Sequence, residues 1–209
     1  GMLPMLDTEG KILLSAPGKI VSGPDGNGGV FKALRSSGAL YDMSQRGIEY
    51  VFFCGIDNAL VNMCDPVFLG FTAESGSPCS SKSVLKRNPE ERVGVFCRKN
   101  GRPCTIEYTE LPKAQRYAVD EKGGLLYGDS NIISHILTAD ALRSICGNGL
   151  AYHAALKKAQ CLGNDGEVIN PETPNAYKFE TFIFDAFSSL EEMAILRVLR
   201  EDEFAPIKN

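Results

Sequence analysis

The chain lacks an excess of basic charge and has no long apolar stretch. Its 26 aspartates and glutamates outnumber its 22 lysines and arginines, which gives a net charge of −4 and a pI near 5.3. A general nucleic-acid-binding protein carries a basic field, so this balance argues against that class but leaves room for a local phosphate-binding cluster. No apolar run reaches about 18 residues and no signal peptide is recognisable, so we expect neither a membrane span nor secretion.

Cysteine and histidine are also without the spacing of metal or disulfide sites. The seven cysteines form no Cys-x-x-Cys pair and their number is odd. This pattern argues against a disulfide framework or a structural zinc site, and it favours reduced thiols in a cytoplasmic protein. The two histidines, His135 and His153, have no partner at ligand spacing, so we expect each to be structural.

Glycine, by contrast, is concentrated in one loop. Four of the seven residues in 23–29 are glycine, and residues 30–34 after them have the pattern of a first helical turn. Glycine allows positive φ angles and close approach of another molecule, and a helix N-terminus offers N–H groups to a polar or anionic ligand. The alternative is a polar turn that only joins two elements. With 209 residues, 44% of them hydrophobic, the chain is long enough for one domain over 1–209 and no second domain is expected.

The strongest strand signal is the apolar, β-favouring run at 50–56, which is typical of a strand buried on both faces in the middle of an α/β sheet. Asp57 and Asn58 follow directly. Ligands in open α/β sheets gather outside the carboxyl ends of strands, so Asp57 is well placed for function. The alternative is that these residues cap a helix beginning at Ala59, and Asn58 could cap while Asp57 acts chemically.

The middle of the chain predicts a hairpin and a further strand. Residues 92–98 and 104–108 are typical of strands, and Asn100-Gly101 between them is a strong hairpin signal. Residues 125–136 predict another strand.

The secondary-structure signals in the C-terminal third of the chain are ambiguous. Residues 149–162 fit either a helix or an extended arm, and a helix from about Glu180 would place Phe184 and Phe187 on one stripe. Residues 189–192 imitate a helix capping box, whereas the family resemblance described next implies a strand at 194–200.

Five motifs in a fixed order carry that resemblance: 23–34, 49–58, 106–110, 182–185 and 200–209. Together they resemble the eukaryotic UDP-N-acetylhexosamine pyrophosphorylases over almost the whole chain. The resemblance implies an α/β fold, a Rossmann-like mixed sheet of the nucleotide-diphospho-sugar transferase (GT-A-like) type. It also implies an enzyme that combines UTP with N-acetylglucosamine 1-phosphate to give UDP-N-acetylglucosamine and pyrophosphate.

The resemblance also assigns roles residue by residue. It implies that Asp57 and Lys208 are catalytic and that Asp57 holds Mg²⁺ between phosphates, because Mg²⁺ is often held by one or two carboxylates with phosphate and water. Glu107 suits sugar hydroxyls because an ionised carboxylate only accepts hydrogen bonds. The implied substrate-binding residues are Gly26, Asn27, Gly28, Gly94, Glu107, Asn131, Lys178, Phe182 and Phe184.

The chain departs from the family pattern in one respect. It has no Gly-rich loop of the type that cradles UTP phosphates, so we expect an internal part of the catalytic domain that is inactive alone and exposes a sheet edge. Two alternatives remain open. One is a pyrophosphorylase acting on a hexose 1-phosphate such as glucose 1-phosphate, and the other is a non-catalytic binding module of the same fold.

Overall fold

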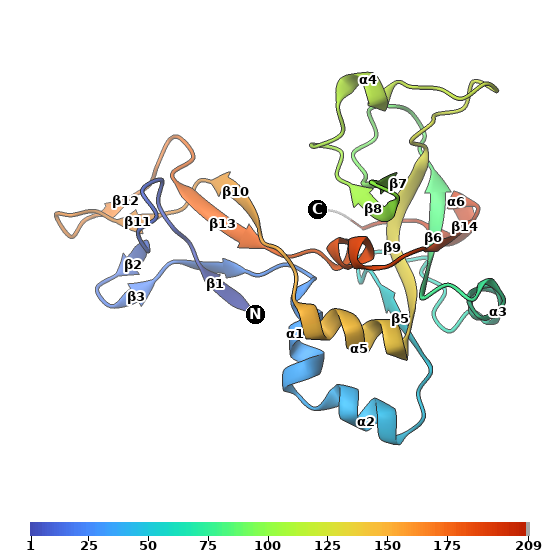
Figure 1. The fold of residues 1–209 in the computed structure, drawn as a ribbon. Helices are drawn as coiled ribbons and strands as arrows, with labels where there is room; N and C mark the ends of the chain where they lie inside the picture. Colours follow the sequence, from blue (N-terminus) through green and yellow to red (C-terminus); the bar gives the residue numbers. More distant parts are fainter. Residues whose placement is uncertain (208–209) are drawn as a thin grey trace. The chain divides into compact units, whose positions relative to one another are not determined.

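The computed structural model describes residues 1–207, which form two compact units (Figure 1). The first unit comprises Gly1–Ser36 and Gly149–Asp185, and the second comprises Ser37–Asn148 and Ala186–Asn209, of which 208 and 209 are not described. Each strand pairing found in the described residues lies within one unit. The sequence predicts a single domain over residues 1–209. This depends on how the two units are arranged, so it stays a prediction. No helix of the described residues is long and apolar enough to cross a membrane.

The second unit is built on a six-stranded sheet with strand order β14-β6-β9-β7-β8, in which β5 also pairs with β9. Its strands are β5 (Tyr50–Cys54), β6 (Cys79–Leu85), β7 (Val95–Lys99), β8 (Arg102–Ile106), β9 (Asp129–Thr138) and β14 (Ala194–Arg197). Its helices are α2 (Ala39–Gln45), α3 (Pro66–Ser75), α4 (Lys113–Arg116), α5 (Ala139–Asn148) and α6 (Arg200–Glu203). The β14–β6 pair is parallel and the other pairs are antiparallel, so the predicted α/β fold with a mixed sheet is confirmed.

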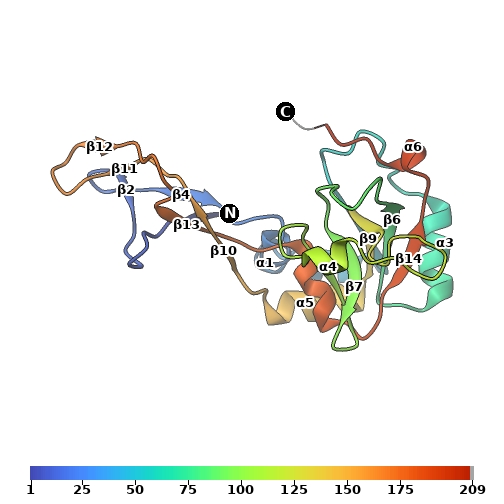
Figure 2. The same ribbon diagram turned by 90° about the horizontal axis from the view of Figure 1, so that it is seen from above.

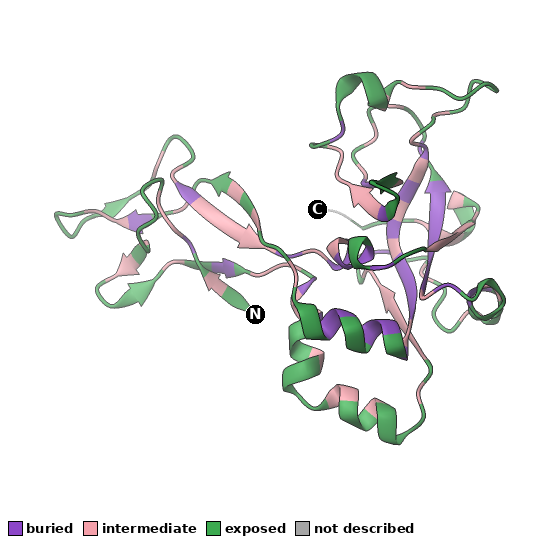
Figure 3. Ribbon diagram, in the orientation of Figure 1, coloured by how far each residue is buried: buried purple, intermediate pink, exposed green. Residues whose placement is uncertain are grey.

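The core of this unit follows β6 and β9. Figure 3 shows buried residues along both strands, and β9 is flanked by β6 on one side and by β5 and β7 on the other. Helix α3 packs on β14 and β6, whereas α5 packs on β5 and β9 (Figures 1 and 2). Asp65 caps α3 by accepting a hydrogen bond from Val67 N, and Pro66 takes the first helical position.

The position of β5 differs from the prediction. The apolar run at 50–56 was expected in the middle of the sheet, but β5 ends at Cys54, pairs with β9 alone among the described strands, and is half-buried at all five positions. An apolar run shows that a strand is covered, but it does not show how many strands flank it. β9 takes the central place instead because its ten residues are long enough to pair with three neighbours.

The hairpin and the last strand were predicted correctly. β7 and β8 pair around Asn100 and Gly101, whose φ angles of 53° and 79° suit the primed turn that Asn-Gly favours. β14 is a strand, so the resemblance to a capping box at 189–192 was misleading.

The first unit consists of small antiparallel pairs and one helix. Its elements are β1 (Met2–Pro4), β2 (Leu14–Ala16), β3 (Lys19–Ile20), β4 (Ser22–Pro24), α1 (Gly29–Ser36), β10 (His153–Lys157), β11 (Cys161–Leu162), β12 (Val168–Ile169) and β13 (Ala176–Glu180). Helix α1 follows the Gly-rich loop as predicted, and 149–162 is extended. The predicted helix from Glu180 is wrong: β13 ends there, and the 3₁₀ helix η1 (Ile183–Ser189) follows. Phe184 and Phe187 are nevertheless both buried.

Candidate functional site

The glycines of the 23–29 loop allow the backbone to pack closely against the chain itself. Gly26 has φ 82°, and a Cβ added there would lie 2.2 Å from the carbonyl oxygen of Thr181. A Cβ on Gly28 would lie 2.8 Å from the carbonyl carbon of Thr181. Any larger residue at either position would therefore push the loop away from Thr181.

Hydrogen bonds fix the same contact. Gly28 N donates to Thr181 O at 2.9 Å, and Thr181 N donates to Asp25 O at 2.8 Å. Asn27 Oδ1 accepts from Ile183 N at 2.9 Å. Free N–H groups were predicted at this loop, but the Gly28 N–H is used within the chain. The ligand contacts proposed for Gly26, Asn27 and Gly28 stay predictions.

An aromatic stack lies directly after this contact. The rings of Phe182 and Phe184 stack with centroids 5.1 Å apart and planes 11° apart, and His153 packs on Phe182 at 5.1 Å. Asp185 holds this arrangement, because its Oδ2 accepts from Phe182 N and both of its oxygens lie 3.0 Å from His153 Nε2. Phe184 is buried and Phe182 is half-buried between Phe184 and His153, so both rings have a packing role, and their contact with an N-acetyl methyl group stays a prediction.

Lys178 is already paired. Its Nζ donates to Glu180 Oε1 at 2.8 Å, and its stem covers Gly23, where an added Cβ would lie 3.2 Å from Lys178 Cε. The side chain therefore has a packing role on β13. Its contact with substrate phosphate stays a prediction.

In the second unit, three predicted residues meet at one point. A Cβ on Gly94 would lie 2.9 Å from Glu107 Oε1, so the Glu107 carboxylate lies directly over this glycine. Asn131 N donates to Gly94 O at 2.8 Å. Residues far apart in the sequence thus form one cluster, Gly94–Glu107–Asn131, at the junction of β7, β8 and β9.

A bulge in β9 connects this cluster to the end of β5. Ser81 opposes His135 and Ser83 opposes Asn131, so a two-residue step on β6 faces a four-residue step on β9. Ile133, inside the bulge, has φ 53°, a left-handed conformation that is unusual for a β-branched residue. Its N–H donates to Asn131 Oδ1 at 2.9 Å, and its carbonyl oxygen accepts from Gly55 N at 2.8 Å.

Asp57 follows this β5 end and is exposed. No side chain in the described part of the chain donates to its carboxylate, while its backbone oxygen accepts from Ile207 N at 2.8 Å. Lys208, the residue after Ile207, lies outside the described residues.

The expected helix at Ala59 does not form, and Asn58 has another role. Its side chain is 4% exposed, donates from Nδ2 to Glu203 O at 2.7 Å and accepts at Oδ1 from Ala205 N at 2.9 Å. Asn58 therefore ties the turn that carries Asp57 to the segment that leads to Lys208.

Comparison with known proteins decides the family. The sequence model of the UTP–glucose-1-phosphate uridylyltransferase family matches residues 1–209. The chain belongs to this family.

Relatives of this uridylyltransferase-family chain are similar along its whole length. It is 42% identical to UDP-N-acetylglucosamine diphosphorylase 2 of Arabidopsis thaliana and 40% identical to UDP-N-acetylhexosamine pyrophosphorylase-like protein 1 of Xenopus tropicalis; both matches cover 100% of this chain and 41% of the relative. The crystal structure of the uridine diphosphate N-acetylglucosamine pyrophosphorylase from Trypanosoma brucei in complex with inhibitor superposes with a TM-score of 0.86 at 32% identity, covering 100% of this chain and 43% of that one. The chain therefore spans about two fifths of the length of the curated relatives.

The chain offers one exposed carboxylate, that of Asp57, for the expected Mg²⁺, and this metal site stays a prediction. Among the described residues, no group of three or more His, Cys, Asp or Glu side chains could hold a metal. Asp57 is one available carboxylate, and Mg²⁺ usually takes one or two carboxylates with phosphate oxygens and water. Asp57 would therefore hold the ion only together with a phosphorylated ligand.

Sequence reasoning missed one group that positions this site. Lys82 on β6 is fully buried, and its Nζ donates to Asp65 Oδ2 at 2.6 Å and Glu203 Oε1 at 2.5 Å. Partial burial alone would raise the pKa of Asp65, but the Lys82 ammonium and the Val67 N–H lower it overall. This buried ion cluster anchors α6, from which the chain continues to Ile207. A single lysine among strand serines gave no sequence signal for it.

The predicted site residues that the structure describes therefore lie in two different units. Gly26, Asn27, Gly28, Lys178, Phe182 and Phe184 belong to the first unit. Asp57, Gly94, Glu107 and Asn131 belong to the second, where the Ile133 bulge connects them.

Proposed function

We propose that the protein carrying this chain forms UDP-N-acetylglucosamine and pyrophosphate from UTP and N-acetylglucosamine 1-phosphate. The observation that carries the proposal is the meeting of Gly94, Glu107 and Asn131 next to the Asp57 turn. The names of the relatives support the same reaction.

The Gly94–Glu107–Asn131 cluster has the chemistry to hold a sugar hydroxyl. Asn131 Oδ1 is occupied by Ile133 N, which leaves the Asn131 amide NH₂ available as a donor. The Glu107 carboxylate, which lies over Gly94, is an acceptor. A hydroxyl both donates and accepts, so it matches these two groups, and Gly94 leaves room for the Glu107 carboxylate.

The reaction is an in-line attack by an already ionised phosphate oxygen on the α-phosphorus of UTP. The protein must therefore align two polyanions rather than provide a general base. When bound, Mg²⁺ neutralises charge on the phosphates. Asp57 would hold the ion, the cluster would orient the sugar, and Lys208 would contact the phosphates.

Two further assignments belong to this proposal. The mixed sheet is of the GT-A-like nucleotide-diphospho-sugar transferase type, supported by the shared direction of β5, β6 and β14, whose carboxyl ends carry Asp57 and the 200–207 segment. The protein works in the cytoplasm, supported by seven free cysteines.

A second candidate is uridylyl transfer to a hexose 1-phosphate. The observation that favours it is the family description, which refers to glucose 1-phosphate. The sequence motifs at 106–110 and 182–185 favour the N-acetyl sugar instead.

A thermal-shift titration with Mg²⁺ tests both candidates. A ligand of the native state stabilises it by RT ln(1 + [L]/Kd), so a site should be visible at millimolar UDP-N-acetylglucosamine. We expect selective stabilisation by that ligand, a smaller shift in Glu107→Gln, and an unchanged shift in Glu121→Gln, which makes the same chemical change at an exposed loop position. A larger shift with UDP-glucose would favour the second candidate. No shift with either ligand would show that this chain alone does not supply the binding energy for the nucleotide sugar.

A further inference from the structure

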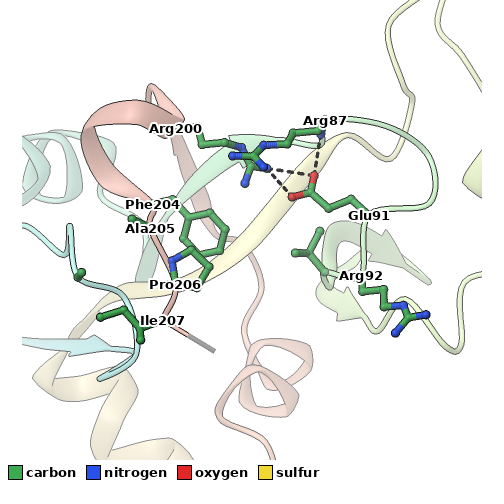
Figure 4. Close-up of a pocket in the computed structure, with 10 residues that line it drawn as sticks. Arg87, Glu91, Arg92, Arg200, Phe204, Ala205, Pro206 and Ile207 are labelled. Atoms are coloured by element: carbon green, nitrogen blue, oxygen red, sulfur yellow. Dashed lines mark hydrogen bonds and ion pairs between the residues drawn. The ribbon is translucent and has the colours of Figure 1, made fainter. Parts of the chain in front are cut away.

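A pocket of about 570 Å³ opens in the second unit beside the Asp57 turn, and none of the residues that line it was predicted to contact substrate (Figure 4). Residues 87–93 after β6 and 200–207 after β14 line it, together with Ala59 after β5. Because β5, β6 and β14 run in one direction, the pocket lies at their carboxyl ends, where α/β sheets bind ligands.

The polar lining of the pocket is dominated by arginine. Arg87, Arg92 and Arg200 contribute to it, against the single carboxylate of Glu91. Arg200 is held by Glu91 Oε1 at 2.9 Å and by Leu85 O at 3.0 Å. In the described part of the chain, the side chains of Arg87 and Arg92 have no hydrogen-bond or ion-pair partner, and both residues are exposed.

The apolar lining provides a firm wall beside these charges. The Arg200 guanidinium lies 5.2 Å from the centre of the Phe204 ring, and Pro206 and Ile207 continue the same wall. Figure 4 shows Arg200 and Phe204 on one side and Glu91 and Arg92 on the other. One arginine is thus fixed in place, while two remain able to move onto a ligand.

We propose that this pocket binds a diphosphate group, with Arg200 as the fixed contact and Arg87 and Arg92 as the mobile ones. The guanidinium fork matches phosphate oxygens two at a time, which makes arginine the preferred residue for such anions. A diphosphate neutralises the excess guanidinium charge. The volume falls within the usual range of small-molecule sites, so the ligand can be free pyrophosphate or the diphosphate of a nucleotide sugar.

The connection to Asp57 gives this pocket its place in the reaction. Ala59 N donates to Ala205 O at 3.1 Å and Ile207 N to Asp57 O at 2.8 Å, so the Asp57 turn forms part of the pocket's rim. Pyrophosphate is the second product of the proposed reaction. The role of the pocket in binding this product therefore rests on the proposed function.

Calorimetric titration of the chain with inorganic pyrophosphate, in EDTA and without nucleotide, tests the site. We expect saturable binding that weakens at least tenfold in Arg87→Ala/Arg92→Ala. The matched control is Arg98→Ala/Arg102→Ala, which removes two exposed arginines from the β7–β8 hairpin and is expected to change affinity less than twofold. Arg200→Lys keeps the charge but loses the fork, and we expect it to weaken binding while the protein stays folded.

Absence of saturable pyrophosphate binding would overturn the proposal, as would an equal loss in the two double variants, which would indicate a general charge effect. Thermal shifts with UDP-N-acetylglucosamine in the same variants separate the two sources of diphosphate. Loss of pyrophosphate binding alone assigns the pocket to the free product, and loss of both assigns it to the nucleotide sugar. A normal UDP-N-acetylglucosamine shift without pyrophosphate binding would remove the pocket proposal and leave the proposed function intact.

Discussion

Replacing His135 should make the protein less sensitive to mild acid. His135 on β9 is fully buried, with Ser81 Oγ 2.6 Å from its Nδ1 and the Phe187 ring at 5.0 Å. Its Nε2 has no hydrogen-bond partner in the described residues. Burial lowers the pKa of His135 from 6.5 to about 3, because the charged imidazolium would lose its hydration there.

The sign of the effect follows from proton binding. Between pH 6.5 and 3 the unfolded chain binds a proton at His135 and the native state does not, so the free energy of unfolding falls as the pH falls through this window. Each pH unit below 6.5 costs about 1.4 kcal/mol, and the loss between pH 7.5 and 5.5 is therefore about 1.4 kcal/mol. Above pH 6.5 the contribution is fully present.

Urea unfolding at pH 7.5 and 5.5, followed by circular dichroism, measures this difference. His135→Phe keeps a ring of similar shape between Phe96 and Phe187 and removes the titrating group. We expect the stability difference between wild type and variant to shift by about 1.4 kcal/mol in favour of the variant at the lower pH. His153→Gln, which leaves His135 in place, should follow the wild type on this point. Parallel pH dependence of wild type and His135→Phe would refute the reasoning.

The remaining predictions concern backbone space and a buried charge. Gly26→Ala should destabilise the chain more than Gly18→Ala, because both glycines have positive φ, but only at Gly26 would a Cβ meet Thr181 O, at 2.2 Å; equal losses by urea unfolding would contradict this. Lys82→Met should cost about 3–5 kcal/mol, because it leaves two partly buried carboxylates uncompensated. The same change at the exposed Lys99 should cost far less, and a comparable loss there would show that burial is not the cause.

Much of the fold was predictable because its signals are local. The Asn100-Gly101 turn fixes the β7–β8 hairpin, and Pro66 after Asp65 fixes the start of α3. Both depend on preferences that act within a few residues.

The failures concern long-range pairing. Asn58 was expected to cap a neighbouring helix, yet its partners, Glu203 and Ala205, lie about 145 residues further along the chain. The helix expected from Glu180 was overridden because β13 pairs with β10 up to that residue. The place of β5 in the sheet depends on how many strands pair with it, which no local pattern encodes.

The candidate site was predictable as a set of residues but not as an arrangement. The family resemblance singled out Gly94, Glu107 and Asn131, and the structure brings them together. Lys82 and Ile133, which position the site, were not predicted, because one acts through distant carboxylates and the other through a backbone conformation.

The left-handed backbone at Ile133 bears on how this protein can evolve. Most positions in a central strand resist change, because a new residue must fit both the backbone and the packing. At Ile133 the present residue is itself a poor match to its φ of 53°, at a cost of about 1–3 kcal/mol, and glycine or asparagine would fit that conformation better. Both hydrogen bonds to Asn131 and Gly55 use the backbone of residue 133, so an exchange to glycine or asparagine can relieve this strain and keep the geometry of the site.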